Sequence, residues 1–160
     1  MTAIAAEGRE MIRSFFGHEH EELIAGIDRL HEVAWDLPGL SAPETARRLC
    51  GVLHWVEETL QPHMAWEEQW LLPTIDDRAP TRWATSLVRF DHRQIAKQTE
   101  LLRMDRSHLE HGRSGDAVTA VRCDLFGLEA LLRADIEREQ VFLLPLLERD
   151  QDAWAPEWRD

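Results

Sequence analysis

The stretch that decides the fold is His63-Met64-Ala65-Trp66-Glu67-Glu68-Gln69-Trp70-Leu71-Leu72-Pro73, because its pattern returns later in the chain. Glu67 and Glu139 are 72 residues apart, and Leu71-Leu72-Pro73 returns at the same distance as Leu143-Leu144-Pro145. The offset also relates His63 to Asp135 and Glu19-His20 to Asp91-His92. The chain therefore consists of two copies of one unit.

Each unit is predicted to form two helices, because its apolar residues recur at alternating steps of three and four. In the second helix of each unit, this face comprises Leu49, Leu53, Val56, Leu60, His63 and Glu67, and then Val121, Leu125, Leu128, Leu132, Asp135 and Glu139. In the leading helices it comprises Phe16, His20, Leu23, Ile27, Leu30 and Ala34, and then Val88, His92, Ile95, Thr99 and Leu102. Three histidines and three acids thus occupy positions that belong to a core.

Burying these six side chains is costly unless something compensates. An unpaired buried polar group costs roughly 2–7 kcal/mol, and an unpaired charge costs considerably more. A bound cation would compensate for all six, whereas the alternative is a network of histidine and carboxylate hydrogen bonds without metal. Because the ionisable residues repeat with one offset, we favour the metal.

The composition is typical of a compact helical domain. The chain has 160 residues, 44% of them hydrophobic, with only 8 glycines and 7 prolines, which argues against disorder. A unit of two helices cannot bury its own apolar stripe, so we expect the two units to pack together. The sequence predicts an all-α fold, an antiparallel up-down four-helix bundle over residues 1–148, with a C-terminal tail over 149–160.

Proline and glycine residues suggest where the helices end. We expect helices over about residues 8–36, from about Ser41, over about 80–110, and to about Glu148. Ser41-Ala42-Pro43-Glu44 resembles a capping box at the start of the second helix. Pro62 is expected to kink that helix, and Pro73 and Pro80 to bracket the crossing to the third.

Charge and cysteine content narrow the class of protein. The net charge is −12 and the bases form no large cluster, so we expect no nucleic-acid partner. No apolar run approaches the roughly 18 residues of a membrane span, and the first residues do not resemble a signal peptide, so we expect no membrane partner and a cytoplasmic location. Cys50 and Cys123 are out of step with the repeat and are predicted to be buried or partly buried free thiols.

These residues resemble the hemerythrin-like, or HHE cation-binding, family over about Phe15 to Leu147. The most specific element is His-x-x-x-Glu-Glu followed by Leu-Leu-Pro. The resemblance implies a non-haem di-iron centre within a four-helix bundle. It assigns His20, His63 and His92 as terminal ligands and Glu67 and Glu139 as carboxylates that bridge the metals.

The donor types agree with such a centre. His63 and Glu67 lie about 40° apart around one helix and one turn along it, so both can reach one metal pair. Imidazole with carboxylate suits iron, manganese or zinc, whereas calcium and magnesium prefer oxygen donors alone. His54 lies about 180° around the helix from His63 and should point elsewhere.

Asp135 stands where the family has a histidine, and Ala96 stands where oxygen-carrying members have another. Asp135 has two interpretations, as an anionic metal ligand or as a structural partner of Arg138 on the next turn. We favour the ligand, because its position on the stripe faces inward. With three histidines, oxygen transport is the less favoured use.

The resemblance implies a protein that binds or reacts with dioxygen, nitric oxide or peroxide at a metal pair. If it is an enzyme, the metals carry the redox step. Two other classes stay open, namely a non-catalytic iron-binding or sensing module and a degenerate bundle that serves protein interaction.

Overall fold

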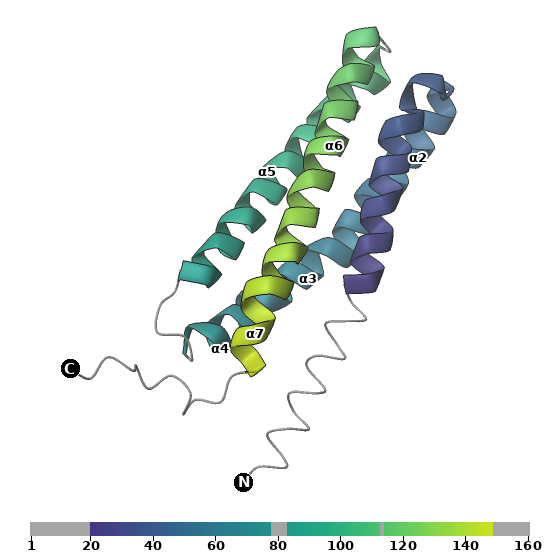
Figure 1. Cartoon of the computed structure of the whole chain (residues 1–160). Helices are drawn as coiled ribbons and strands as arrows, with labels where there is room; N and C mark the ends of the chain where they lie inside the picture. The colour runs from purple at the N-terminus through teal and green to yellow at the C-terminus, as the bar shows by residue number, and fades with distance from the viewer. Residues whose placement is uncertain (1–19, 78–82, 113, 149–160) are drawn as a thin grey trace, which may run out of the picture.

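The computed structural model describes residues 20–77, 83–112 and 114–148 of the chain (Figure 1). Every regular element within these ranges is helical, and no strand occurs among them. None of the helices within these ranges is both long and apolar enough to cross a membrane. The predicted start of the first helix, the tail over 149–160 and the residues around Pro80 lie outside the described ranges.

The first unit is a helix hairpin. Its leading helix, described over 20–36, ends at the predicted residue and is followed by a 3₁₀ turn, η1 (Leu37–Gly39). The second helix runs without a break through α2 (Ala42–Trp55), η2 (Val56–Leu60), α3 (Gln61–Trp66), η3 (Glu67–Leu71) and α4 (Leu72–Asp76). Ser41 caps it by accepting a hydrogen bond from the backbone N–H of Glu44 at 3.4 Å.

The second unit repeats this hairpin. It comprises α5 (Trp83–His111) and a second helix formed by α6 (Gly115–Arg138), η4 (Glu139–Leu143) and α7 (Leu144–Glu148). Ser114 caps α6 by accepting from the N–H of Ala117 at 3.1 Å. The four helices run antiparallel, with α5 beside α6, so the predicted all-α four-helix bundle is confirmed (Figure 1).

Three π-helical turns interrupt the second helices, and each comes two residues before a proline. The turns η2, η3 and η4 end at Leu60, Leu71 and Leu143, ahead of Pro62, Pro73 and Pro145. Proline has no N–H to donate to the preceding turn, and a wider turn is one way in which a helix adjusts to this loss. Pro73 therefore lies within the helix, and the prediction that it begins the crossing to the third helix is wrong.

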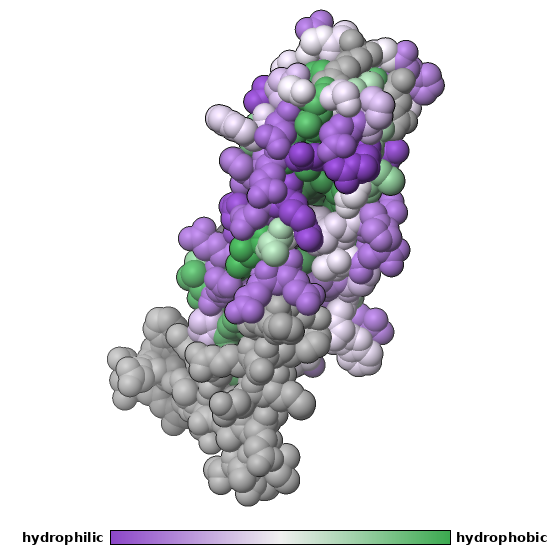
Figure 2. All heavy atoms as spheres, turned by 90° about the vertical axis from the view of Figure 1, so that its right-hand side faces the viewer, coloured by the Kyte–Doolittle hydropathy of each residue, from purple (hydrophilic) through white to green (hydrophobic). Residues whose placement is uncertain are grey.

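The core consists of two apolar clusters. The larger includes Leu30, Leu60, Ile95 and Leu132 and extends toward the η1 end of the bundle. The smaller comprises Leu71, Leu72, Ile75, Val88, Leu143 and Leu147. Hydrophilic residues cover most of the face seen in Figure 2, with hydrophobic residues exposed between them, as expected for amphipathic helices.

Cys50 and Cys123 are free and exposed, so the prediction of buried thiols is wrong. The reason lies in the phase of the helix. Cys50 follows the buried residue Leu49 directly, and neighbouring residues point about 100° apart around an α-helix.

Candidate metal centre

The six ionisable residues on the apolar stripes come together in one buried layer. They are contributed by all four helices, namely the first helix (His20), α3 and η3 (His63 and Glu67), α5 (His92), and α6 and η4 (Asp135 and Glu139). Each of them is no more than 8% exposed. Thus every residue predicted for the site is inside the bundle.

The layer lies between the two apolar clusters. In the second helix, His63 and Glu67 are flanked by Leu60 of the larger cluster and Leu71 of the smaller. Two other helices repeat this order, with His92 between Val88 and Ile95, and with Asp135 and Glu139 between Leu132 and Leu143. Apolar packing on both sides therefore keeps water away from the polar groups.

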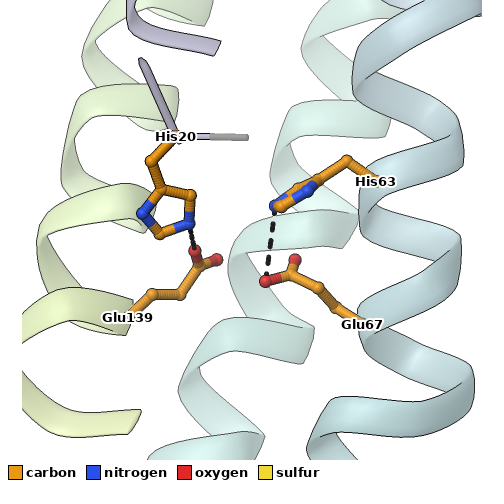
Figure 3. Close-up of side chains that lie close together, drawn as sticks. All are labelled: His20, His63, Glu67 and Glu139. Carbon is orange, nitrogen blue, oxygen red and sulfur yellow. Dashed lines mark ion pairs between the residues drawn. The ribbon is translucent and has the colours of Figure 1, made fainter. Parts of the chain in front are cut away.

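One group of potential ligands consists of His20, His63, Glu67 and Glu139. Each offers a donor atom, and these atoms all lie within 4.8 Å of one another. His20 Nε2 lies 3.0 Å from Glu139 Oε2, and His63 Nε2 lies 3.4 Å from Glu67 Oε1. Figure 3 shows the four side chains pointing toward a common space.

A second group consists of His92, Asp135 and Glu139, again with donor atoms within 4.8 Å. His92 Nε2 lies 3.7 Å from Asp135 Oδ2 and 3.2 Å from Glu67 Oε2. Glu67 therefore directs one oxygen toward His63 and the other toward His92, and Glu139 belongs to both groups. The two glutamates thus lie between the remaining donors of the two groups, and these buried side chains could hold a cation.

Several donor atoms in this layer lack hydrogen bonds. Among the described residues, His92 Nε2, both carboxylate oxygens of Glu67, Asp135 Oδ1 and Glu139 Oε2 are buried and accept or donate none. Buried polar atoms are nearly always satisfied in folded proteins, so this number in one place indicates that a ligand completes the site. The mixed imidazole and carboxylate donors fit iron, manganese or zinc.

In the metal-free layer, the pKa values of three of the donor side chains are raised, which favours their protonated forms. Burial and the nearby charge of Glu139 raise the pKa of Asp135 to about 8. Burial lowers the pKa of His92, but its contacts with Glu67 and the charge of Asp135 outweigh that effect and raise the pKa to about 9. The pKa of Glu139 is also raised, by burial and by the charge of Glu67.

Glu67 behaves in the opposite way. Burial by itself would raise its pKa, but His63 and His92 face its two oxygens and bring the pKa down to about 2. The layer thus keeps one carboxylate ionised between two histidines while its other acids favour the protonated form.

The contacts of Arg138 and Asp135 bear on the two interpretations of Asp135. Arg138 does not pair with it, because the Arg138 side chain donates to Asp91 Oδ2 at 2.5 Å. Asp135 is 4% exposed and faces His92. Asp135 therefore faces the inside of the layer, as the ligand interpretation requires.

Sequence reasoning missed the residues that hold the histidines from behind. Glu68 Oε1 lies 3.1 Å from His92 Nδ1, and the Gln140 amide nitrogen lies 3.4 Å from His20 Nδ1. Both residues directly follow a buried glutamate, Glu67 or Glu139, and both obey the repeat offset. That position in the repeat is the signal that could have identified them.

The π-helical turns were missed as well. Glu67 and Glu139 are the first residues of η3 and η4, and the N–H of the residue after each turn donates to the glutamate carbonyl, five residues back. Single π turns of this kind are often found at functional sites.

Comparison with known proteins agrees with these features. The model of the hemerythrin HHE cation binding domain matches residues 11–147 of the chain. No curated protein and no solved structure matches significantly. The match covers most of the chain and includes all six buried donors, and the chain therefore belongs to the hemerythrin HHE cation-binding domain family.

Proposed function

We propose that the chain holds two non-haem iron ions and that the loaded protein binds or reacts with dioxygen, nitric oxide or peroxide. The observation that carries this proposal is the layer of six buried donors between two apolar clusters, in which atoms of Glu67, His92, Asp135 and Glu139 lack hydrogen bonds. His20, His63, His92 and Asp135 would be terminal ligands, and Glu67 and Glu139 would be shared between the ions.

Iron would supply a redox-active centre at which a small molecule can exchange electrons. The protein would position the ions and exclude larger molecules, because the cavity beside the donors has a volume of only about 10 Å³. Its lining includes His63, Asp135, Leu23, Trp55 and Leu132. A cavity of this size holds about one water molecule, so it supports a diatomic or similarly small ligand rather than an organic substrate.

Elemental analysis of protein purified without added metal, with an optical spectrum of the same sample, tests the proposal. We expect about two irons per chain, as the two groups of donors imply. Manganese or zinc at the same stoichiometry would replace iron in the proposal. No metal after reconstitution with iron would overturn it and leave a bundle that serves protein interaction.

A pair of histidine variants locates the metal. His63→Ala should lose much of the metal, because it removes a buried donor. His54→Ala is the matched control, since His54 is an exposed histidine of the same long helix. Equal metal content in both variants would contradict the site.

Asp135→His tests the remaining ligand. It replaces an anionic donor with a neutral one, so the variant should retain metal and shift toward reversible dioxygen binding. An unchanged metal content and spectrum would mean that Asp135 is not a ligand. A peroxide-decomposition assay on the iron-loaded protein then decides between an enzyme, which turns over, and a sensing module, which does not.

A further inference from the structure

Large hydrophobic side chains are exposed mainly on one helix of the bundle. Among the described residues, four of the nine exposed large hydrophobic side chains belong to α5, whereas α2 and α6 contribute none. The four are Trp83, Phe90, Leu101 and Met104. In Figure 1, α5 lies beside α6 at one edge of the bundle, so one of its sides faces away from the other helices.

Three of these residues, Phe90, Leu101 and Met104, lie on this outer side in one line with the basic residues Arg93 and Lys97. The steps between positions 90, 93, 97, 101 and 104 are three or four residues. All five side chains therefore point within about 80° of one another around the helix, along about 21 Å of its length. We call these five residues the outer stripe of α5.

The fold does not require this stripe. The inner side of α5 supplies the core with Ile95 and Leu102, both of which are 0% exposed. On the outer stripe, in contrast, Phe90 is 50%, Leu101 40% and Met104 52% exposed. A single exposed apolar residue is common on protein surfaces, whereas several along one line are typical of an interaction site.

The centre of the outer stripe is basic, although the chain as a whole carries a net charge of −12. The Arg93 guanidinium lies over the Phe90 ring, 5.8 Å from its centroid. Within the described part of the chain, neither Arg93 nor Lys97 pairs with a carboxylate, and the neighbouring acid of α5, Glu100, pairs with Arg103 instead. Lys97 is also the only lysine of the chain. The stripe thus presents two such cations between apolar residues.

A second copy of the chain would be a poor partner for this stripe. Two copies packed antiparallel about Lys97 would bring their lysines together, and two copies packed parallel would place every residue against its own counterpart. Like charges in contact oppose association. A helix with carboxylates in the middle and apolar residues on either side would instead match both the charge and the apolar contacts.

We propose that the outer stripe of α5 is a docking surface for an acidic amphipathic helix of another protein. Apolar side chains of that helix pack on Phe90, Leu101 and Met104, and its carboxylates pair with Arg93 and Lys97 between them. Met104 suits such a contact, because an unbranched, flexible side chain adapts to the shape of what covers it.

The docking surface lies behind the donor layer. Phe90 and Arg93 flank Asp91 and His92 in the sequence, and His92 faces the layer from the inner side of the same helix. The docked helix is then separated from the layer by the thickness of α5, about 10–12 Å. Binding of this partner needs no metal, so the inference is independent of the proposed function.

Two synthetic peptides test the proposal on the full chain as purified. Both are fluorescein-labelled helices of about 20 residues with the same apolar stripe, and they differ only in carrying glutamate or lysine opposite the basic pair of α5. Fluorescence anisotropy should show that the acidic peptide binds about tenfold more tightly than the basic one, or better. Equal affinities, or no binding of the acidic peptide, would overturn the proposal.

A pair of aromatic variants locates the contact. Phe90→Ala should weaken binding of the acidic peptide about tenfold, because it removes an apolar anchor. Trp35→Ala is the matched control, since Trp35 is an aromatic residue of the first helix that is 70% exposed. It should leave the affinity unchanged, and circular dichroism verifies that both variants keep their helices. If the two variants bind the peptide equally well, the peptide does not use this stripe and the proposal fails.

The single lysine allows the contact to be mapped chemically. A carbodiimide joins an amine to a carboxylate that touches it, so mass spectrometry of the treated complex should find the acidic peptide on Lys97. Lys97→Arg keeps the charge without the reactive amine, and this variant should bind the peptide but lose that cross-link. Lys97→Glu should weaken binding by about tenfold or more, because repulsion replaces attraction. Absence of a cross-link on Lys97 of the native chain would overturn the placement.

Sedimentation equilibrium of the native chain and of Phe90→Ala examines the other occupant. A native dimer that Phe90→Ala dissociates would show that a second copy covers the stripe, and it would overturn the proposal. A monomer, or a dimer that Phe90→Ala leaves intact, agrees with it. Because none of these measurements depends on iron, their failure would leave the proposed function standing, and failure of the proposed function would leave this surface standing.

Discussion

Replacing Gly26 with alanine should destabilise the protein, although alanine is the better helix former. Gly26 is buried within the first helix, and the indole ring of Trp55 from α2 lies directly against its backbone. A methyl group built on Gly26 would overlap Cε2, Cζ2 and Nε1 of that ring. Ordinary contact between carbon atoms requires about 3.5–4.0 Å, so the ring would have to move.

The size of the effect follows from two opposing contributions. Alanine in a helix interior gains roughly 0.5–1 kcal/mol over glycine. Overpacking of a core costs typically 1–3 kcal/mol, and this case belongs at the upper end because a rigid ring is displaced rather than a flexible chain end. The cavity beside Trp55 is about 10 Å³, which leaves the ring little space to retreat. We therefore expect a net loss of about 2 kcal/mol.

Gly51→Ala is the internal comparison. Gly51 lies in the interior of α2, and a methyl group there would have nothing within 4 Å beyond the adjacent residues and backbone of its own helix. Only the helix propensity then changes, so this variant should be more stable by about 0.5–1 kcal/mol. Urea denaturation of the metal-free proteins, followed by circular dichroism, measures both changes in the free energy of unfolding.

A double-mutant cycle separates the ring from other causes. In a Trp55→Leu background the side chain at position 55 is smaller, so Gly26→Ala should cost less than in the native chain. A coupling of about 1–3 kcal/mol is expected for residues in direct contact. If Gly26→Ala stabilises the native chain as Gly51→Ala does, or if the cycle shows no coupling, the reasoning from the Trp55 contact is refuted.

Three further predictions concern charge. Metal uptake at pH 7 should release protons, because the pKa values of His92 and Asp135 are raised to about 9 and about 8 and both side chains must lose a proton to bind a cation. Calorimetry in buffers of different ionisation enthalpy counts the released protons. Release of no proton would contradict the assignment of these two residues as ligands. In the metal-free protein, the stabilising contribution of Asp135 should be lost as the pH rises from about 3.8 to 8, and that of His92 as it rises from about 6.5 to 9. Both groups have a folded pKa above the ordinary values of 6.5 and 3.8, so their stabilising contribution disappears as the pH rises through the folded pKa, and thermal melts that stay flat over this range would exclude it. Arg138→Ala should cost about 1–3 kcal/mol in urea denaturation, because it leaves the buried Asp91 carboxylate without its donor, and a neutral result would show that water replaces the arginine.

The repeat and its apolar stripes were sufficient to predict the bundle and the inward position of all six donors. Residues on one face of a helix recur with a period of 3.6, so a residue at such a position, whether it is a leucine or an acid such as Glu67 or Asp135, is predicted to face the core. The ends of helices were predictable where the chemistry is local, as at Ser41, whose side chain accepts from the backbone of Glu44.

The other features of the site depend on interactions that the spacing of apolar residues along one helix does not reveal. A π-helical turn such as η3 shifts the hydrogen-bond register by one residue, and the sequence marks it only by Pro73 further on. In the sequence Glu68 looks like an ordinary surface residue, because its contact is with His92 on another helix. Whether Asp135 pairs with Arg138 could not be decided from their spacing, since Asp91 competes for the arginine from α5.

The two apolar clusters on either side of the donor layer also bear on how long a bound ion would stay. Within the described residues, the cluster around Leu71 and Leu143 is much the smaller, and it borders the π turns η3 and η4. Regions with few buried contacts open locally at a lower free energy than the whole molecule. Opening of this end alone would expose the layer while the rest of the bundle remained folded. The residence time of an ion and the global stability of the fold are thus separate quantities here, and a substitution in the smaller cluster can change the first without the second.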